Sequence, residues 1–235
     1  MAKLRVDKIA ASGQISENTG SVFFDGSGDY LETKKNGSDF DFGGDFTIET
    51  WIYINTIPSN SLIDFLGSSN NSAYLGSGKS GWIAAYYTLN STGLQFRLSY
   101  QNSSSWTFEL GWNYTAAAGN WYHVAYTRES GTINCYIDGV KLTRSTTIGT
   151  ESASIVTSEG FLRIGGGYGT ALRQLDGYIS NFRICKGHAV YTSSFAPPTR
   201  EQKFIQRRFF LLVMMERISL QISLEDTSLQ HMVIV

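Results

Sequence analysis

The carboxylates of this 235-residue sequence are poorly placed for glycoside hydrolysis. That reaction needs two carboxylates flanking the scissile bond. On a β-strand they would stand two or four residues apart, because strand side chains alternate between faces with a period of two. Glu49 and Glu109 each stand alone on their expected strands, and the adjacent Glu225 and Asp226 would point to opposite faces. The sequence therefore predicts no catalytic residue and argues against an enzyme.

Histidine and cysteine offer no stronger site. Neither a His-Glu-x-x-His motif nor a paired Cys-x-x-Cys motif is present, so zinc is not expected. His123 lies in the middle of an expected strand beside Tyr122, where a structural role is the simpler interpretation. Cys135 and Cys185 are expected on different strand faces, so we expect two free thiols, with a disulfide as the alternative.

Calcium is the one metal for which the sequence offers suitable ligands. It takes about six to eight oxygen ligands from carboxylates and carbonyls of loops. Asp25 and Asp29 flank Gly26-Ser27-Gly28, so both carboxylates could point into one turn. The alternative is that the two aspartates cap the turn itself, as Asp often does.

Aromatic side chains are the candidates for stacking on sugar rings. They form 14% of the chain, and most are expected in the core or on sheet faces because large aromatic residues are usually buried. Trp112, Tyr114 and Tyr168 lie in segments rich in Gly and Asn. We therefore expect these three to be exposed in loops and to bind a ligand.

Strands must position all of these side chains. In residues 45–55, Phe46, Ile48, Ile52 and Ile54 share one face by period-two alternation, the pattern of a β-strand. Asp138-Gly139 predicts a hairpin turn. The expected strands are Val22–Phe24, Tyr30–Thr33, Asp45–Asn55, Ser61–Leu66, Trp82–Thr88, Leu94–Tyr100, Trp106–Leu110, Trp121–Arg128, Thr132–Asp138, Val140–Arg144, Phe161–Gly165 and Gly177–Ile184. Short strands at this spacing, without helical periodicity, predict an all-β sandwich or barrel.

Charge and hydropathy exclude several classes of partner. Charged residues form 17% of the chain and the formal net charge is -1, without the basic stripe that nucleic-acid binding needs. The first eight residues contain no apolar core of a secretory signal. No stretch approaches the roughly 18 apolar residues of a membrane span. We therefore expect no nucleic acid, no membrane span and no signal peptide.

Four segments in order resemble a known family of β-sandwiches. Val22–Leu31 (VFFDGSGDYL), Asp45–Ile54 (DFTIETWIYI), Asn120–Val140 and Leu162–Gly187 resemble strands of laminin G-like, concanavalin A-like lectin/glucanase jelly rolls. The resemblance covers about residues 21–199. It implies a two-sheet antiparallel jelly-roll sandwich, often one calcium ion, and ligand binding by loops at one rim. Asp176 resembles a family position close to the Asp25–Asp29 turn, so the resemblance also makes Asp176 a possible metal ligand.

The closing segment His188–Thr199 (HAVYTSSFAPPT) and the leader MAKLRVDKIA resemble a subgroup found in structural proteins of tailed, especially marine, bacteriophages. That resemblance implies a place on a virion or an extracellular surface. The partners would be a glycan or surface polysaccharide, or other virion proteins.

The two ends of the chain differ from the middle. Residues 1–20 are polar and are interpreted as an arm or leader. Residues 200–235 do not continue the strand pattern and include the apolar run Phe209–Met215. We interpret this tail as the product of a frameshift near residues 200–210, because the shifted frame after Met214 and Met215 can encode a polar, turn-rich ending. A genuine C-terminal helix or a disordered tail is the alternative.

Two functions of different kinds fit these observations. The first is a non-catalytic module that binds a glycan or surface polymer, and the second is a purely structural protein without a small ligand. A glycoside hydrolase is the least favoured because the carboxylate pair is missing. Exposed loop aromatics favour binding, but the sequence does not separate the first two functions.

Overall fold

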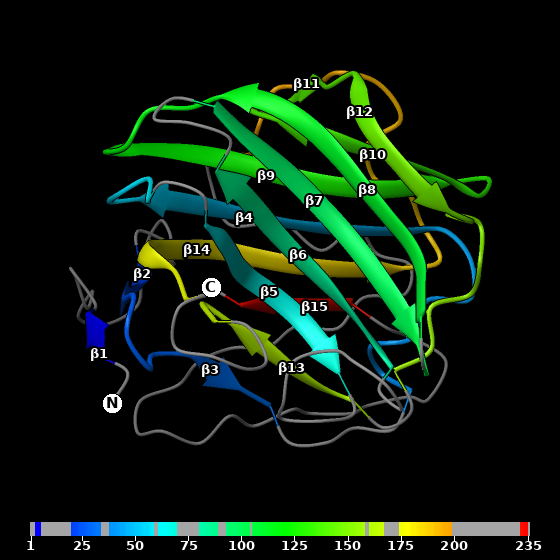
Figure 1. Ribbon diagram of the computed structural model, residues 1–235, viewed down its shortest axis with the longest axis horizontal. Helices are drawn as coiled ribbons and strands as arrows, with labels where there is room; N and C mark the ends of the chain where they lie inside the picture. Colours follow the sequence, from blue (N-terminus) through cyan, green and yellow to red (C-terminus); the bar gives the residue numbers. More distant parts are fainter. Residues whose placement is uncertain are drawn as a thin grey trace, which may run out of the picture.

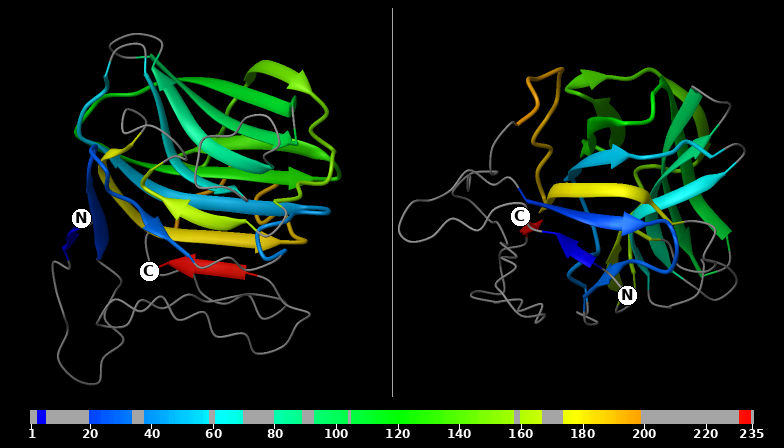
Figure 2. Two further views of the ribbon diagram at one scale, coloured as in Figure 1. Left: turned by 60° about the horizontal axis from the view of Figure 1, so that its bottom comes forward. Right: turned by 90° about the vertical axis from the view of Figure 1, so that its left-hand side faces the viewer.

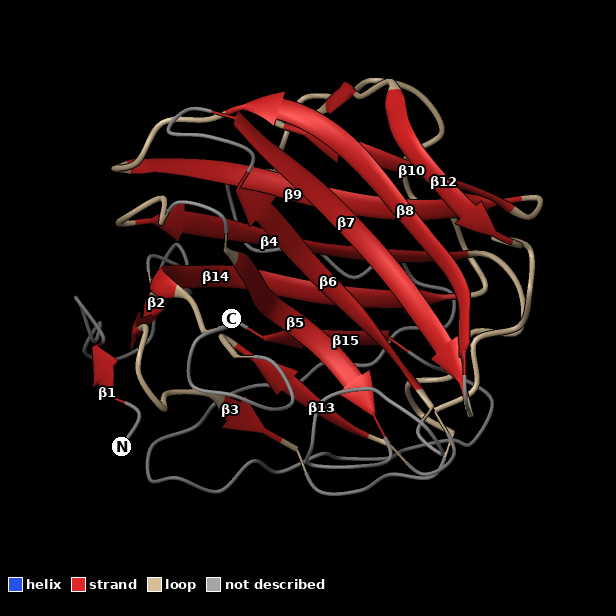
Figure 3. Ribbon diagram, in the orientation of Figure 1, coloured by secondary structure: helices blue, strands red, loops and turns tan. Residues whose placement is uncertain are grey.

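The chain folds into two antiparallel β-sheets packed face to face (Figures 1 and 3). The computed structural model describes residues 3–5, 20–33, 38–58, 61–69, 80–88, 93–103, 105–157, 160–166, 174–198 and 231–234. These residues contain strands and turns but no helix, and therefore no helix that could cross a membrane. The predicted all-β, two-sheet antiparallel sandwich of the jelly-roll kind is confirmed.

The first sheet has eight strands and includes both ends of the chain. Its order along the sheet is β1 (Lys3–Arg5), β2 (Ser21–Asp25), β14 (Asp176–Lys186), β4 (Phe46–Ile54), β9 (Asn120–Glu129), β10 (Thr132–Ile137) and β11 (Val140–Lys141), and β15 (His231–Ile234) pairs with β14. Of the expected arm and tail, only β1 and β15 with Gly20 belong to the described residues. The frameshift interpretation therefore stays a prediction.

The second sheet has seven strands. Its order is β12 (Arg144–Gly149), β8 (Ser105–Thr115), β7 (Gly93–Asn102), β6 (Gly81–Thr88), β5 (Leu62–Ser69), β13 (Phe161–Ile164) and β3 (Leu31–Glu32). Figure 1 shows β6, β7 and β8 crossing obliquely in front of the first sheet.

The core lies between the two sheets and follows from the alternation seen in the sequence. On β4, Phe46 and Ile48 point inward and are at most 1% exposed. They face a layer from the second sheet that includes Trp82, Phe96 and Leu110, all fully buried. Burying each such side chain stabilises the fold by about 1.5–3 kcal/mol.

One predicted strand is wrong in its course. Residues 140–144 were expected to form a single strand, but Val140–Lys141 pairs in the first sheet and the chain then crosses to the second sheet as β12. Leu142, partly buried against the core, lies at the crossing. The Asp138-Gly139 turn before it adopts positive φ values of 50° and 77°, as a hairpin turn of this type requires.

A β-bulge in β14 shifts the phase of that strand. Before it, Tyr178 and Ser180 pair with Tyr53 and Trp51 of β4; after it, Arg183 pairs with Glu49. Asn181 in the bulge has a φ of 50°, a left-handed conformation that Asn tolerates better than most residues. The extra residue turns Arg183 to the outer face of the first sheet, which would otherwise receive Phe182.

Residues 187–198 form a strap across this outer face. Figure 2 (right) shows the strap, in orange, on the side of the first sheet that faces away from the second sheet. The Oγ1 of Thr47 donates to the carbonyl of His188 at 3.1 Å and accepts from the N–H of Val190 at 2.8 Å. The N–H of Phe195 donates to the carbonyl of Gly139 at 2.9 Å, and Nε1 of Trp51 donates to the carbonyl of Pro198 at 3.0 Å.

The bulge predicts a specific pattern of tolerance at position 181. Asn181→Gly should leave the free energy of unfolding unchanged or slightly raised, because glycine adopts positive φ freely. Asn181→Val should lower it by about 1–2 kcal/mol, the usual cost of a left-handed conformation for a residue with a Cβ. Urea unfolding of both variants measures the difference. Equal stabilities would show that residue 181 does not need this conformation.

Candidate functional site

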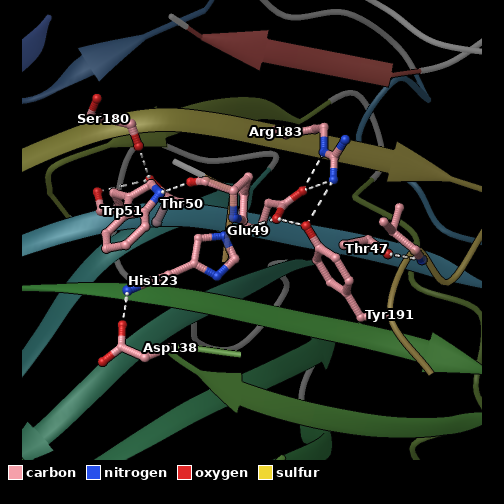
Figure 4. A network of polar contacts seen from close by, with 11 residues as sticks. Thr47, Glu49, Thr50, Trp51, His123, Asp138, Ser180, Arg183 and Tyr191 are labelled. Carbon is pink, nitrogen blue, oxygen red and sulfur yellow. Dashed lines mark hydrogen bonds and ion pairs between the residues drawn. The ribbon is translucent and has the colours of Figure 1, made fainter. Parts of the chain in front are cut away.

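The strap covers a buried network of charged and polar side chains centred on Glu49 (Figure 4). Arg183 forms an ion pair with Glu49 through Nε and Nη2. The Nε2–H of His123 donates to Oε2 of Glu49 at 3.0 Å, and the hydroxyl of Tyr191 donates to the same oxygen at 2.8 Å. Strands β4, β9 and β14 and the strap each contribute one of these four residues.

The neighbours keep the Glu49 carboxylate charged despite its burial. Burial alone would raise the pKa of Glu49, but the hydrogen bond from His123 and the charge of Arg183 outweigh it and hold the pKa below its ordinary value of 4.5. Burial likewise raises the pKa of Tyr191, and the nearby Glu49 charge raises it further, so the phenol stays protonated and can donate.

The charged centre of this network is buried. The side chains of Glu49 and His123 are at most 1% exposed and that of Arg183 is 4% exposed, whereas Tyr191 in the strap is half-buried. The rings of Tyr191 and Phe195 stack at 3.5 Å, and Phe195 also packs on His123 and Tyr136. The network therefore fastens the strap to the sheet, and the interpretation of His123 as a structural histidine is consistent with its burial.

The aromatic residues predicted to lie exposed in loops do not do so where they are described. Trp112 is 1% exposed, because β8 runs on to Thr115 and Trp112 continues its inward-facing set with Phe108 and Leu110. Tyr114 lies on the same strand, half-buried, with its ring edge-to-face on Tyr122 at 5.7 Å. The expected loop position is wrong for both residues, and the expected exposure is wrong for Trp112. Whether either residue binds a ligand stays a prediction. Tyr168 lies outside the described residues.

The three predicted metal ligands lie at one end of β2 and β14. Asp25 and Asp176 are cross-strand partners on the outer face of the first sheet. Oδ1 of Asp25 accepts from the N–H of Ser27 at 2.8 Å, and Oδ2 of the buried Asp29 accepts from the N–H of Asp25 at 3.4 Å. These bonds agree with the alternative that Asp25 and Asp29 cap their own turn.

The same end of the sheet holds Asp176 in a fixed orientation. Its Oδ1 accepts from Nδ2 of Asn55 at 2.8 Å, and its Oδ2 accepts from Oγ1 of Thr56 at 2.9 Å. Among the described residues, no three His, Cys, Asp or Glu side chains gather in a way that could hold a metal ion. The calcium expectation is not tested by this and stays a prediction.

A patch of four aromatic side chains lies beside these aspartates. Phe23, Tyr178, Tyr53 and Trp121 are successive cross-strand partners on β2, β14, β4 and β9, all on the outer face. Ring centroids are 4.9 Å apart for Phe23 and Tyr178, 5.6 Å for Tyr178 and Tyr53, and 5.5 Å for Tyr53 and Trp121. We call these four residues the aromatic patch.

The patch is a compact surface rather than a flat row. The rings of Trp121 and Tyr178 come within 6.3 Å of each other although β4 separates their strands, so the two rings close over Tyr53. Trp121 is 38% exposed, among the few large apolar side chains of the described chain that are so open. The other three are half-buried and remain partly accessible.

A row of hydrogen-bonding side chains borders the aromatic patch. Toward one end of the sheet, Asp25 and Asn55 lie two residues after Phe23 and Tyr53, and Asp176 on the antiparallel β14 lies two residues before Tyr178, so all three point to the same face. We call these three residues the polar row. An apolar aromatic surface next to oriented carboxylate and amide groups can stack on a sugar ring and bind its hydroxyl groups.

The outer face of the second sheet offers a different arrangement. Nη1 of Arg97 pairs with Oε1 of Glu109 at 3.3 Å, and Nε of Arg97 donates to Oε1 of Gln95 at 2.7 Å. The carboxylate of Asp64 lies on the same face, three strands away from Glu109, or about 14 Å between backbones at the usual strand spacing. Two carboxylates that hydrolyse a glycoside lie within about 9.5 Å of each other.

Part of this surface was visible in the sequence. Alternation places Glu49 and Tyr53 on one face of β4, and Tyr178 on the outer face opposite Ile179. What the sequence lacked was the register that brings Phe23 and Trp121 from distant segments beside them. Exposed aromatic residues were expected in loops, whereas in the structure the aromatic patch lies on a sheet face.

Comparisons with known proteins agree with the fold. A family model described as the concanavalin A-like lectin/glucanases superfamily matches residues 25–189. None of the curated protein sequences searched matches the chain.

Similar solved structures include a heptameric SAP-like pentraxin from Limulus polyphemus, at 18% identity over 69% of this chain and 71% of that chain, with a TM-score of 0.49. Domain 4 of a GH43 extracellular arabinanase from Geobacillus stearothermophilus matches at 16% identity over 76% and 78%, with a TM-score of 0.48. Domains LG4-5 of the mouse laminin alpha1 chain match at 15% identity over 80% of this chain and 49% of that fragment, with a TM-score of 0.47.

The buried network predicts a loss of stability in acid that depends on Glu49. Folding lowers the pKa of Glu49 below its ordinary value of 4.5. The charged carboxylate therefore contributes its full stabilisation of the fold above pH 4.5, and this contribution is lost as the pH falls through the pKa of Glu49 in the folded protein. Glu49→Gln should lower the free energy of unfolding by about 3 kcal/mol near neutral pH, since it leaves Arg183 without its buried partner. The variant should also lose less stability than the wild type between neutral pH and about pH 3.

Denaturant unfolding at several pH values measures both effects. Glu109→Gln is the matched control, because it breaks a partly exposed ion pair with Arg97 and should cost at most about 1 kcal/mol. If Glu49→Gln and Glu109→Gln cost the same, the network does not stabilise the strap in the way described.

Proposed function

The chain belongs to the concanavalin A-like lectin/glucanases superfamily, and from this we propose that it is a non-catalytic module that binds a glycan with the outer face of its first sheet. The observation that carries the proposal is that the aromatic patch and the polar row lie next to each other on one sheet face. Trp121 supplies an exposed apolar ring, and Asp176, held by Asn55 and Thr56, supplies oriented oxygen atoms on the strand that carries Tyr178. Apolar stacking combined with a few fixed polar groups is the usual chemistry of small-ligand sites.

A binding role is supported over catalysis by the surroundings of the carboxylates. Glu49 is sealed beneath the strap, and Glu109 is paired with Arg97. Asp25 and Asp176 accept hydrogen bonds that fix them in place, which suits recognition of hydroxyl groups. A carboxylate that protonates a leaving group instead needs a raised pKa and a second carboxylate at a set distance.

A structural role is the second candidate, and the aromatic patch also gives it a basis. Exposed apolar side chains gathered on one face often mark contacts with other proteins. The resemblance of residues 188–199 to phage structural proteins supports a place for the module on a virion or another extracellular surface, with virion proteins as further partners. Mass spectrometry of purified particles from the source of this sequence tests that location directly, and absence of the chain from particles would refute it.

Replacing Trp121 should separate binding from folding. Trp121→Ala removes the most exposed ring of the patch and should weaken glycan binding by at least about five-fold, since large aromatic contacts in binding sites are commonly worth more than about 1 kcal/mol. Its melting temperature should change little, because the ring is 38% exposed. A glycan array followed by calorimetry on the best ligand measures both.

The matched control is Tyr30→Ala. Tyr30 is also 38% exposed, but its ring lies under the guanidinium of Arg163 on the second sheet. It should bind glycans as the wild type does. If Trp121→Ala and Tyr30→Ala lose the same glycan affinity, the glycan does not bind at the aromatic patch. If the folded wild-type protein binds no glycan, the structural role is favoured.

We also propose calcium at the rim next to the polar row. Asp25 and Asp176 would supply carboxylates, Asp29 would hold the turn or supply a third, and backbone carbonyls would complete the shell that calcium takes. Addition of calcium to chelator-treated protein should then raise the melting temperature, and Asp25→Asn should reduce that rise. An identical melting curve with calcium and with chelator would exclude this site.

A further inference from the structure

The strap limits the binding surface on one side. Trp51 lies two residues before Tyr53 on the same face of β4, and its indole Nε1 donates to the carbonyl of Pro198 in the strap. Beyond Trp51 the outer face is covered, as the burial of Glu49 and His123 shows. Among the described residues, the open part of this face next to the strap is a strip formed by the aromatic patch and the polar row.

The strip runs across the strands. Its aromatic members come from four neighbouring strands, which span about 14 Å at the usual strand spacing. The rings are closer together than the backbones, since Trp121 lies 6.3 Å from Tyr178. A linear ligand that follows the strip lies perpendicular to the strands and contacts a length of only about two or three sugar residues.

The strip carries negative charge along one edge. Asp25 is exposed and Asp176 is half-buried, and the seven residues of the patch and the row include no Lys, Arg or His. The cationic residues nearest in register, Lys3 and Arg5 of β1, pair with Phe23 and Ser21 at the β2 end of the strip. A carboxylate or sulfate group placed against Asp25 or Asp176 would therefore meet like charge, whereas neutral hydroxyl groups can donate to both aspartates.

From these three observations, and resting on the proposed glycan-binding function, we infer that the ligand is a short stretch of an uncharged glycan that lies across β2, β14, β4 and β9. Ring faces stack on Trp121 and Tyr178, and hydroxyl groups along one edge of the glycan donate to Asp25 and Asp176. In the calcium-free protein, the carboxylates of the polar row disfavour chains that carry carboxylate or sulfate groups.

The first test compares neutral and acidic glycans on the full chain. An array of both kinds, read in low salt with a chelator present, identifies the ligands; the chelator is needed because a bound calcium ion would cancel the negative charge. The ligands should be uncharged, and a methyl-esterified oligosaccharide should bind at least about five-fold more tightly than its free acid, the factor expected for one like-charge contact in water. Asp25→Asn should reduce this preference and high salt should abolish it.

The second test varies ligand length. With the best neutral ligand as probe, the affinity should rise from the monosaccharide to about the trisaccharide and then level off. A preference for acidic glycans, or an affinity that rises steadily to the hexasaccharide, would overturn this inference. The proposed glycan binding would still hold if Trp121→Ala weakens that binding as predicted. No binding to any glycan on the array would overturn the proposed function and this inference together.

Discussion

The buried charge of Glu49 is the constraint around which the first sheet is arranged. A carboxylate that is at most 1% exposed is stable only if it is paired and hydrogen-bonded. Three parts of the chain meet this need: β14 supplies Arg183, β9 supplies His123 and the strap supplies Tyr191. The bulge at Asn181 and the path of the strap both follow from it, because the bulge turns Arg183 toward Glu49 and the strap covers the resulting ion pair.

That arrangement also divides the outer face of the sheet into two halves. Over one half the strap removes water and the side chains serve stability. Over the other half, which residues 187–198 do not cover, side chains of β2, β14, β4 and β9 remain accessible as the aromatic patch and the polar row. A site built on sheet strands is held more rigidly than one built on loops, so little ordering is needed when a ligand binds.

The period-two alternation of apolar and polar residues predicted most of the fold but few of the residues of the candidate site. It placed nearly all strands and identified the buried face of β4, because burial on one side forces that pattern. It misjudged residues 140–149, where the chain changes sheets, and Trp112, because Gly111 and Asn113 looked like loop residues although β8 continues through them. It could not bring Phe23 and Trp121 together, since cross-strand register between segments about 100 residues apart is fixed by tertiary packing. Ile179 and Phe182 both face inward although they are three residues apart, and this break in the period of two is the signal in the sequence that marks the bulge.

The position of β14 within the first sheet has a consequence for how the protein is made. This late strand lies between β2 and β4, which leave the ribosome well over 100 residues earlier. Until it arrives, both strands have a free edge and Glu49 has no cation beside it, which is the kind of intermediate that aggregates or pairs with another chain. Such long sequence separation also makes folding slow. The sheet is thus completed only after β14 has emerged, and until then the open edges of β2 and β4 must not pair with other strands.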